Sequence, residues 1–238
     1  METIQGKHIL IAGAAGGIGR EAAKLLKQSG ARLYLLARDS ARLEALRQEL
    51  NLDAAQCIAA DLSDEAQLAA AARQIHAQTP QLDVLVNAAG TGIIKPLETL
   101  SLAEFRQTLD DNLVAPFLLL KQFLPPMKEA KKGLIINIPG VLGKTPMAGA
   151  AAYAASKYGL NGMMKSIREE LKRTDIRITN LYLGGVDTPF WDEIDLRVQR
   201  DKFIEAKEAA RAIWFLCQQP SSGVVSEMVI QPFNHQAI

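Results

Sequence analysis

The sequence predicts an α/β fold, in which a single domain forms a doubly wound parallel sheet of about seven strands with helices on both faces. Two observations support this prediction. Short apolar runs typical of buried strands alternate with helical segments along the whole chain. A glycine-rich turn at residues 13–19 separates the first apolar run from the first helix. Because no linker, repeat or low-complexity tract interrupts the pattern, we expect residues 1–238 to form one unit.

The individual elements follow from apolar spacing and from the residues that end a helix. Strands are expected at residues 8–12, 32–37, 56–60, 83–87, 134–138, 176–182 and 224–230. Helices are expected at 20–29, 41–50, 64–78 and 205–218, the first ended by Gly30 and the third by Pro80. Ser101 and Glu104 have the spacing of a capping box and begin a long helix that is expected to end at Pro125. A further helix surrounds Tyr153.

Composition excludes several classes of protein. With 27 Lys and Arg against 26 Asp and Glu, the net charge of +1 gives no reason to expect a nucleic-acid or anionic membrane partner. Cys57 and Cys217 are too far apart for a metal or redox motif, so we expect no metal and two free thiols in a reducing compartment. The first residues contain no apolar signal core, and no run approaches the ~18 apolar residues of a membrane span. A cytoplasmic protein is expected.

The glycine-rich turn is a candidate pyrophosphate cradle of the Rossmann type. Gly13, Gly17 and Gly19 follow the first strand and begin the first helix. Glycine permits positive φ and lets the backbone approach a phosphate closely, and a helix N-terminus favours an anion. The spacing differs from the dinucleotide fingerprint that has two residues between the last glycines. A tight packing turn would give the same pattern.

The end of the second strand favours NADP(H) over NAD(H). An acidic residue at this place binds the ribose 2′-hydroxyl of NAD, whereas an arginine accommodates the 2′-phosphate of NADP. The strand ends in Ala37 and Arg38, with Asp39 directly after them. Arg42 and Arg20 could add to the phosphate contact. The solvated, charged start of a helix is the alternative explanation.

Tyr153 and Lys157 form a candidate acid/base pair. They lie four residues apart in a helical sequence, and residues at that spacing share one face of a helix. A nearby positive charge lowers the pKa of a tyrosine, which would let the phenol act near neutral pH. A tyrosine and a lysine on a solvated helix face would give the same spacing.

Together these motifs resemble the short-chain dehydrogenase/reductase family over essentially the whole chain, in particular its NADP-preferring 3-oxoacyl-carrier-protein reductases and carbonyl reductases. Leu183 stands where the family usually has proline, and Ala88 departs from its usual pair of asparagines. Positions that match the family's cofactor-binding motifs are Gly13, Gly17, Ile18, Gly19, Arg38, Asp61, Leu62, Asn87, Ala88, Gly90, Tyr153, Lys157, Gly185, Val186 and Thr188.

The resemblance implies hydride transfer between the nicotinamide of NADP(H) and a carbonyl or secondary alcohol substrate. Tyr153 would then exchange a proton with the substrate oxygen, and Lys157 would lower the tyrosine pKa and hold the nicotinamide ribose. Asn112 matches the family's asparagine that positions a water and completes a proton relay to Lys157. A helix-interior amide bonded to a neighbouring main chain is the alternative role for Asn112.

Gly140 departs from the family at an important position, because a serine there usually hydrogen-bonds the substrate oxygen. Loss of one such donor typically costs about 3 kcal/mol of transition-state stabilisation. Thr145, a water or a substrate hydroxyl could take its place. Weak, substrate-assisted or absent activity would each be consistent with the glycine.

The substrate pocket is expected to contain Gly140, Leu142, Met147, Phe190 and Trp191. The two aromatic residues follow the nicotinamide motif and suggest a mobile lid over an apolar or aromatic carbonyl compound. A packed loop of core aromatics is the other interpretation. Residues 190–206 are too few for a separate substrate domain.

Three functions remain open from the sequence. They are an NADP(H)-dependent reductase or dehydrogenase, a cofactor-binding protein that has lost catalysis, and an interaction scaffold without a nucleotide. The helices around Asn112 and Tyr153 carry apolar residues on more than one face, which indicates a second surface to bury against. In the family that the chain resembles, these two helices pair with their two-fold mates, so the resemblance implies a homodimer or homotetramer. The residues expected at that interface are Leu113, Phe117, Leu118, Leu120, Ala151, Ala154, Leu160 and Met163.

Overall fold

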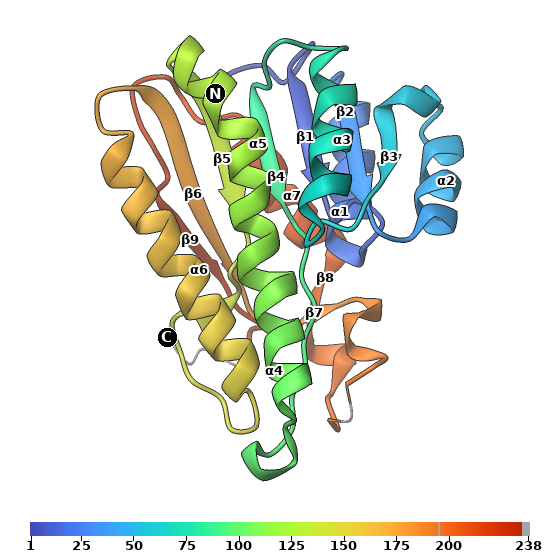
Figure 1. Cartoon of the computed structure of the whole chain (residues 1–238), viewed down its shortest axis with the longest axis vertical. Helices are drawn as coiled ribbons and strands as arrows, with labels where there is room; N and C mark the ends of the chain where they lie inside the picture. Colours follow the sequence, from blue (N-terminus) through green and yellow to red (C-terminus); the bar gives the residue numbers. More distant parts are fainter. Residues whose placement is uncertain (195, 235–238) are drawn as a thin grey trace.

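A seven-stranded parallel sheet forms the centre of the computed structural model, which describes residues 1–194 and 196–234 (Figure 1). The order across the sheet is β3-β2-β1-β4-β5-β6-β9. Since β1 lies between β2 and β4, the chain changes direction across the sheet at this point, which is where such sheets bind ligands beyond the strand ends. The predicted fold class is confirmed. The strand bounds are β1 His8–Ala12, β2 Arg32–Ala37, β3 Cys57–Ala59, β4 Val84–Asn87, β5 Lys132–Asn137, β6 Asp175–Leu183 and β9 Glu227–Ile230.

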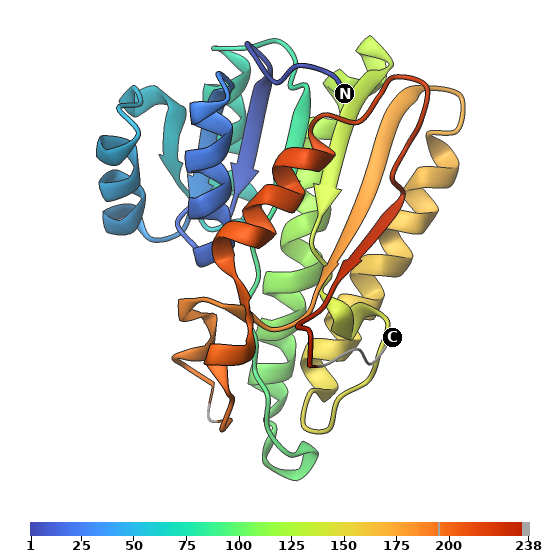
Figure 2. The ribbon, with the colours of Figure 1, turned by 180° about the vertical axis from the view of Figure 1, so that it is seen from behind.

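Helices cover both faces of the sheet. α3 (Glu65–His76), α5 (Ala115–Ala130) and α6 (Ala151–Glu170) pack on one face, where Leu68, Phe123 and Leu160 share a buried apolar cluster. The opposite face carries α1 (Gly17–Gln28), α2 (Ser40–Glu49) and α7 (Ala206–Leu216), as seen from behind in Figure 2. Apolar layers therefore cover both faces of the sheet, and the carboxyl ends of its strands are where a site is expected.

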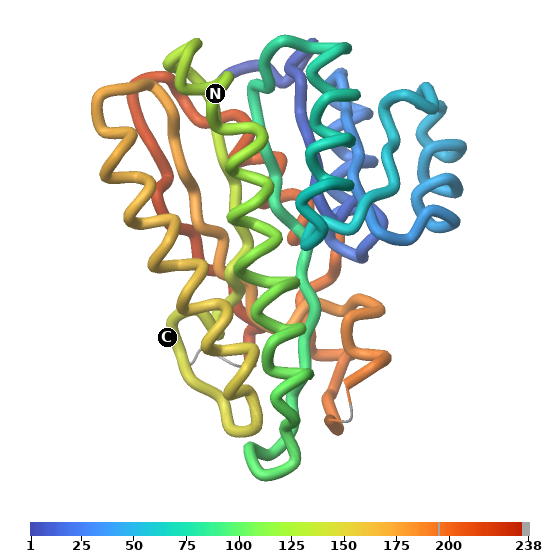
Figure 3. Tube along the Cα trace, in the orientation of Figure 1, coloured from blue at the N-terminus to red at the C-terminus, as the bar shows by residue number. Residues whose placement is uncertain are grey.

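The long helix after the fourth strand differs from its prediction. The capping box begins α4 (Leu102–Leu109) as expected, but residues Asp110–Val114 (η3) form a π-helical turn, and α5 then continues to Ala130. Figure 3 shows the three segments as one continuous rod. The predicted end at Pro125 is wrong. Pro126 cannot donate to the carbonyl of Gln122, and the His76 ring nitrogen Nε2 donates to that carbonyl instead, at 3.2 Å.

Three strands, β3, β4 and β9, are shorter than predicted, and two short strands were not predicted. β9 begins at Glu227 because the main chain of Val225 bonds side chains: its N–H donates to Gln219 Oε1 and its carbonyl accepts from Thr179 Oγ1. β3 begins at Cys57 because Gln56 belongs to the preceding 3-10 turn η1 (Ala54–Gln56). β7 (Val186–Asp187) pairs with β8 (Ile204–Glu205). This pair joins the two ends of the loop between β7 and β8.

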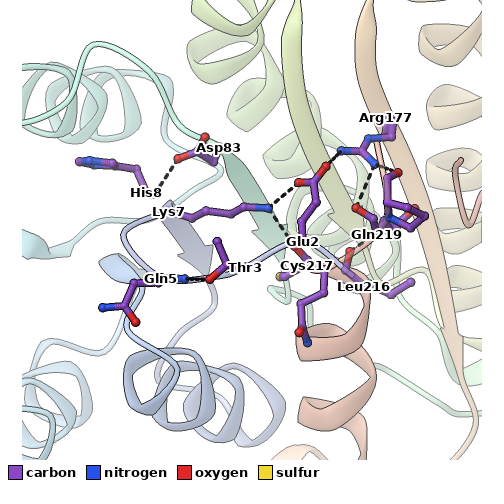
Figure 4. A network of polar contacts seen from close by, with 12 residues as sticks. Glu2, Thr3, Gln5, Lys7, His8, Asp83, Arg177, Leu216, Cys217 and Gln219 are labelled. Carbon is purple, nitrogen blue, oxygen red and sulfur yellow. Dashed lines mark hydrogen bonds and ion pairs between the residues drawn. The ribbon is translucent and has the colours of Figure 1, made fainter. Parts of the chain in front are cut away.

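The amino-terminal segment is tied to the end of the sheet where the strands begin (Figure 4). Lys7 Nζ donates to Glu2 Oε2 at 2.9 Å and to the carbonyl of Cys217 at 3.3 Å. The Arg177 guanidinium donates to the carbonyl of Gln219 at 3.4 Å and lies 4.0 Å from the Glu2 carboxylate. Every one of these charged groups has a partner, so the network fastens the first residues to α7 and β6.

Candidate active site

A cavity of about 210 Å³ lies at the carboxyl edge of the sheet, around the switch point between β1 and β4. It is lined by the glycine turn and by residues that follow β2, β3 and β4. Six predicted cofactor-binding residues line it: Gly13, Arg38, Asp61, Leu62, Ala88 and Gly90. The other predicted positions in the glycine turn and after β6, together with Asn87, lie outside its lining.

The glycine turn is built for close approach of main chains. Gly13 has φ 78°, and a Cβ there would lie 2.6 Å from the amide nitrogen of Ala89. A Cβ at Gly17 would lie 2.5 Å from Thr188 Cγ2, so the predicted nicotinamide loop does contact this turn. No side chain caps the first turn of α1. Close packing therefore requires these glycines, and the uncapped turn also fits a pyrophosphate at a helix N-terminus.

Arg38 extends into the cavity from the end of β2. Its side chain is 61% exposed, and its Nη1 lies 3.8 Å from Asp111 Oδ1. Arg42 lines the same cavity but pairs with Asp39 at 3.3 Å. The expected phosphate contact from Arg20 is not supported, because Arg20 lies outside the cavity lining and pairs with a glutamate of α2 at 2.6 Å.

The acidic and amide residues after β3 and β4 have partners of their own. Asp61 Oδ1 accepts from the backbone N–H of Ser63 at 2.9 Å and from its hydroxyl at 2.7 Å, which fixes the turn. Asn87 is buried and donates to Asn137 Oδ1 at 2.8 Å, its neighbour across the sheet. Asp61 thus lines the cavity, and its contact with a cofactor stays a prediction, whereas Asn87 supports the strand ends beside it.

Tyr153, Lys157 and Asn112 come together around Gly90. Helix α6 places Tyr153 and Lys157 on one face, with the Lys157 ammonium 5.3 Å from the tyrosine ring centroid. A Cβ at Gly90 would lie 2.7 Å from Asn112 Oδ1 and 3.0 Å from Lys157 Nζ. Because Gly90 also lines the cavity, Lys157 and Asn112 lie next to the predicted cofactor cleft, with the Tyr153 ring beside Lys157.

Burial controls the ionisation of the tyrosine and the lysine. Lys157 is 3% exposed and forms no ion pair within the described part of the chain. Burial lowers its pKa to about 8. Burial also raises the pKa of the Tyr153 phenol above its ordinary value, the opposite direction to the expected effect of Lys157. Desolvation therefore outweighs the attraction between phenolate and ammonium in this arrangement.

Asn112 occupies the π-helical turn and is fully buried. Its Oδ1 accepts from the Thr91 N–H at 3.1 Å, and its Nδ2 donates to the Thr91 carbonyl at 2.9 Å. The alternative interpretation is therefore correct for the side chain, which bonds a neighbouring main chain. A π-turn widens the helix locally, and such turns are frequent at functional sites.

Gly140 adopts a backbone conformation that explains the missing serine. Its φ of 68° and ψ of 168° lie in a region occupied almost only by glycine. Thr145 follows the 3-10 turn η4 (Val141–Gly143), and its N–H donates to the carbonyl of Val141, the first residue of that turn. Leu142 and Met147 lie half-buried in the same segment. A serine at position 140 would be strained in this main-chain conformation.

The predicted lid residues form a row of aromatic contacts. The Phe190 ring lies 5.9 Å from the Tyr153 ring, centroid to centroid, and also contacts Gly92. Trp191 packs edge-on against Phe190 at 5.3 Å, and its Nε1 donates to the Val186 carbonyl at 2.9 Å. Phe190 and Trp191 belong to the 3-10 turn η5 (Pro189–Trp191). Phe190 therefore covers the tyrosine from the β7–β8 loop.

Several cavity residues escaped the sequence-based prediction, and two of them form a polar pair. Thr91 and Asp111 both line the cavity, and the Thr91 hydroxyl donates to Asp111 Oδ2 at 2.7 Å. The available signal was position alone, since Thr91 directly follows Gly90 and Asp111 directly precedes Asn112.

Comparison with known proteins identifies the family. A family model described as short chain dehydrogenase matches residues 7–199, and the chain belongs to this family of oxidoreductases. An uncharacterized oxidoreductase of Staphylococcus epidermidis is 29% identical over 232 residues, covering 98% of this chain and 100% of that protein. A metagenomic short-chain oxidoreductase, solved in complex with NADP, is 37% identical with a TM-score of 0.82 and covers 97% and 99% of the two chains. A 3-ketoacyl-(acyl-carrier-protein) reductase of Brucella melitensis, solved with NADH, is 27% identical with a TM-score of 0.87 and covers 97% and 98%.

The described part of the chain contains neither a metal-ligand cluster nor a membrane-spanning helix. Within residues 1–194 and 196–234, no group of three or more His, Cys, Asp or Glu side chains could hold a metal ion. No helix in these ranges combines the length and apolar character needed to cross a membrane. Cys57 and Cys217 are free thiols.

Proposed function

We propose that the protein is an NADP(H)-dependent reductase or dehydrogenase that interconverts a carbonyl compound and a secondary alcohol. The observation that carries this proposal is the meeting of Lys157 Nζ and Asn112 Oδ1 at Gly90, with Tyr153 one helical turn away on α6. Membership of the oxidoreductase family supports it. The glycine turn and Arg38 supply the features expected of a nucleotide site next to these residues.

The nicotinamide cofactor, when bound, supplies or accepts the hydride. Tyr153 exchanges the proton at the substrate oxygen, and its hydroxyl stays protonated until that step because burial raises its pKa. Lys157 is poised between its charged and neutral forms near pH 8, so it is able to hold the ribose and to pass on a proton. Asn112 keeps the loop at Thr91 in place beside the ammonium. Phe190 limits access of water to the tyrosine from the loop side.

The cofactor preference is proposed to be NADP(H) over NAD(H). The support is Arg38 at the end of β2, where the neighbouring Ala37 carries no carboxylate and both residues line the cavity. Among similar structures, one holds NADP and another holds NADH, so the preference has to come from this chain's own residues.

A second candidate is a cofactor-binding protein with weak or no catalysis. Gly140 favours it, because this position provides no hydroxyl to the substrate oxygen and its φ of 68° disfavours any side chain. The catalytic proposal then needs another donor, and Thr145 is the nearest hydroxyl along the chain.

A panel of carbonyl compounds with NADPH, followed through the loss of absorbance at the dihydronicotinamide band, tests the catalytic proposal. Turnover of at least one compound is expected, with apolar and aromatic ketones ahead of charged ones because Phe190 lies beside Tyr153. Binding of NADPH without turnover of any compound would replace the reductase with the second candidate. Absence of binding would remove both.

The Gly140→Ser variant separates a missing donor from a required backbone. At φ 68° a serine is strained, so we expect it to lower the free energy of unfolding by about 1–2 kcal/mol and to leave carbonyl reduction unimproved. Gly140→Ala is the matched control, since it has the same strain without the hydroxyl. Higher activity in the serine variant alone would show that the native enzyme lacks an oxyanion donor.

Assembly and location are further proposals. Phe117 of α5 is 47% exposed and Tyr158 of α6 is 44% exposed, which supports a homodimer or homotetramer through these helices. The cytoplasmic location is proposed from the sequence alone. Three of the residues expected at the interface, Leu118, Leu120 and Leu160, are instead buried in the core of the chain itself. Sedimentation at micromolar concentration tests the assembly, and a pure monomer would contradict it.

A further inference from the structure

Asp111 is an acidic side chain inside the predicted cofactor cleft. It lies in the π-helical turn directly before Asn112, and its side chain is only 10% exposed. Its Oδ2 accepts from the Thr91 hydroxyl at 2.7 Å, and its Oδ1 accepts from Gln107 Nε2 at 3.0 Å. Both donors are uncharged, so they fix the carboxylate in position without neutralising its charge.

Arg38 is the cation that faces this carboxylate. Its Nη1 lies 3.8 Å from Asp111 Oδ1, although the two residues come from different elements, the end of β2 and the π-helical turn. Within residues 1–194 and 196–234, Asp111 is the only acidic residue that lies within ion-pair distance of Arg38. The second cavity arginine, Arg42, already pairs with Asp39. Arg38 is thus the cation available to a ligand phosphate, and Asp111 is its present partner.

Asp111 is held more tightly by its hydrogen bonds than by its contact with Arg38. Asp111 is largely buried and held by short hydrogen bonds, whereas Arg38 is 61% exposed and its contact with Asp111 is long. A phosphate that binds Arg38 would lie near the negative charge of Asp111, and Thr91 and Gln107 keep that carboxylate in the cleft. The two negative charges repel each other, and solvent reduces this repulsion without removing it.

We propose that Asp111 is a specificity-determining residue of the cleft, because its carboxylate competes with the 2′-phosphate of NADP(H) for the Arg38 guanidinium. The inference rests on the proposed NADP(H) function. Asp111 therefore narrows the preference for NADPH over NADH that Arg38 creates, and a chain without this charge discriminates more strongly between the two cofactors.

Calorimetric titration of NADPH and NADH into the full-length protein and its Asp111→Asn variant tests the inference. Asparagine keeps the shape and the bond to Thr91 while removing the charge. We expect the variant to bind NADPH about 3- to 10-fold more tightly, the scale of one partly screened charge interaction, with the NADH affinity unchanged. The gain should shrink as salt is raised.

Asp110→Asn is the matched control. Asp110 lies one residue away in the same π-helical turn, carries the same charge, is exposed and lies outside the cavity lining. Its substitution should leave both affinities unchanged. An equal gain in both variants would assign the effect to overall charge and overturn the role of Asp111.

Arg38→Gln in both backgrounds tests whether the two residues act on each other. Competition for Arg38 requires that Asp111→Asn improve NADPH binding less in the Arg38→Gln background than in the native one. An equal gain in both backgrounds overturns the competition.

Other results also decide the matter. Unchanged NADPH affinity in Asp111→Asn overturns the inference and leaves the proposed function intact. Weaker NADH binding in that variant, with NADPH unchanged, would make Asp111 a ligand of the ribose hydroxyls and overturn the competition. If the native protein binds neither nucleotide, the proposed function fails and the inference fails with it.

Discussion

The two edges of the sheet use the same kinds of side chain in different ways. At the edge where the strands begin, Lys7 is bonded to the Glu2 carboxylate and to a main-chain carbonyl, and the Arg177 guanidinium is bonded to carbonyls (Figure 4). At the edge where the strands end, Lys157 is buried without an ion pair in the described part of the chain, and Arg38 has only a long contact with Asp111. Charges at the first edge are satisfied, and charges at the second are available.

This difference separates structural from functional charges more clearly than residue type does. A buried cation without an ion-pair partner is costly, and such cations are concentrated at functional sites. Lys157 meets this description and Lys7 does not. Substitutions at the two edges should therefore affect different measurements: activity and cofactor affinity at one edge, and stability alone at the other.

The largest expected effect is on catalysis. Tyr153→Phe should lower carbonyl reduction by about 10³-fold, because a positioned proton donor is lost, while NADPH affinity stays close to native. Tyr158→Phe is the control on the same helix, since Tyr158 is exposed and its hydroxyl bonds the Lys144 carbonyl. Steady-state rates for the two variants give the result, and equal activity in Tyr153→Phe and the native protein would remove Tyr153 from the mechanism.

The second effect is a dependence of stability on pH. Burial lowers the folded-state pKa of Lys157 to about 8, whereas an ordinary lysine titrates near 10.5, so the unfolded chain binds one more proton between these values. The free energy of unfolding should therefore rise from pH 8 to 10.5, by at most about 3 kcal/mol.

Denaturant unfolding of the native protein and of Lys157→Met across this range measures the effect. The difference in unfolding free energy between them should rise with pH, because methionine does not titrate and other groups cancel in the difference. A constant difference would mean that Lys157 has an ordinary pKa in the folded protein.

The third effect concerns cofactor choice. Arg38→Gln should reduce the ratio of NADH to NADPH dissociation constants by about 10-fold, since an exposed charge-assisted bond to the 2′-phosphate is lost. Arg42→Gln should reduce it less because Arg42 already pairs with Asp39. Calorimetric titration provides the constants. Equal affinities of the native protein for the two cofactors would contradict the assignment.

The smallest effect is expected at the opposite edge. Glu2→Gln should lower the free energy of unfolding by about 0.5–1 kcal/mol, because it weakens a partly exposed pair in which the hydrogen bond from Lys7 lowers the Glu2 pKa. NADPH affinity should not change. A change in that affinity, measured by the same titration, would show that the two edges are coupled.

Most of the fold was predictable because the spacing of apolar residues and the residues that begin or end a helix act over short stretches of the chain. The apolar runs set the strands, and the capping box at Ser101 and Glu104 set the start of α4. The end of α5 was not predictable from its prolines, since the carbonyl that Pro126 leaves free is bonded by His76, a residue 46 positions from Gln122 along the chain. Edge strand β9 was overextended because side chains from elsewhere bond the main chain of Val225.

The site was predictable to the extent that its residues occur in motifs. Tyr153 and Lys157 were named from their spacing and Asn112 from the family resemblance. The structure brings Lys157 and Asn112 together at Gly90, with the Tyr153 ring beside Lys157. The dominance of burial over attraction in the Tyr153 pKa depends on packing that spacing does not reveal. Likewise, the positive φ of Gly140 gives its glycine a conformational reason, although the sequence showed only a missing hydroxyl.

The π-helical turn at Asp110–Val114 also bears on chain length. A π-turn closes with a bond five residues back, from the Ala115 N–H to the Asp110 carbonyl, so it takes about one more residue than an α-turn to complete the same rotation. Deleting one residue between 110 and 114 is therefore expected to give a regular α-helical turn and to move Asp111 and Asn112 away from the cleft. The added residue of the π-helical turn is in this way linked to the position of two side chains of the site.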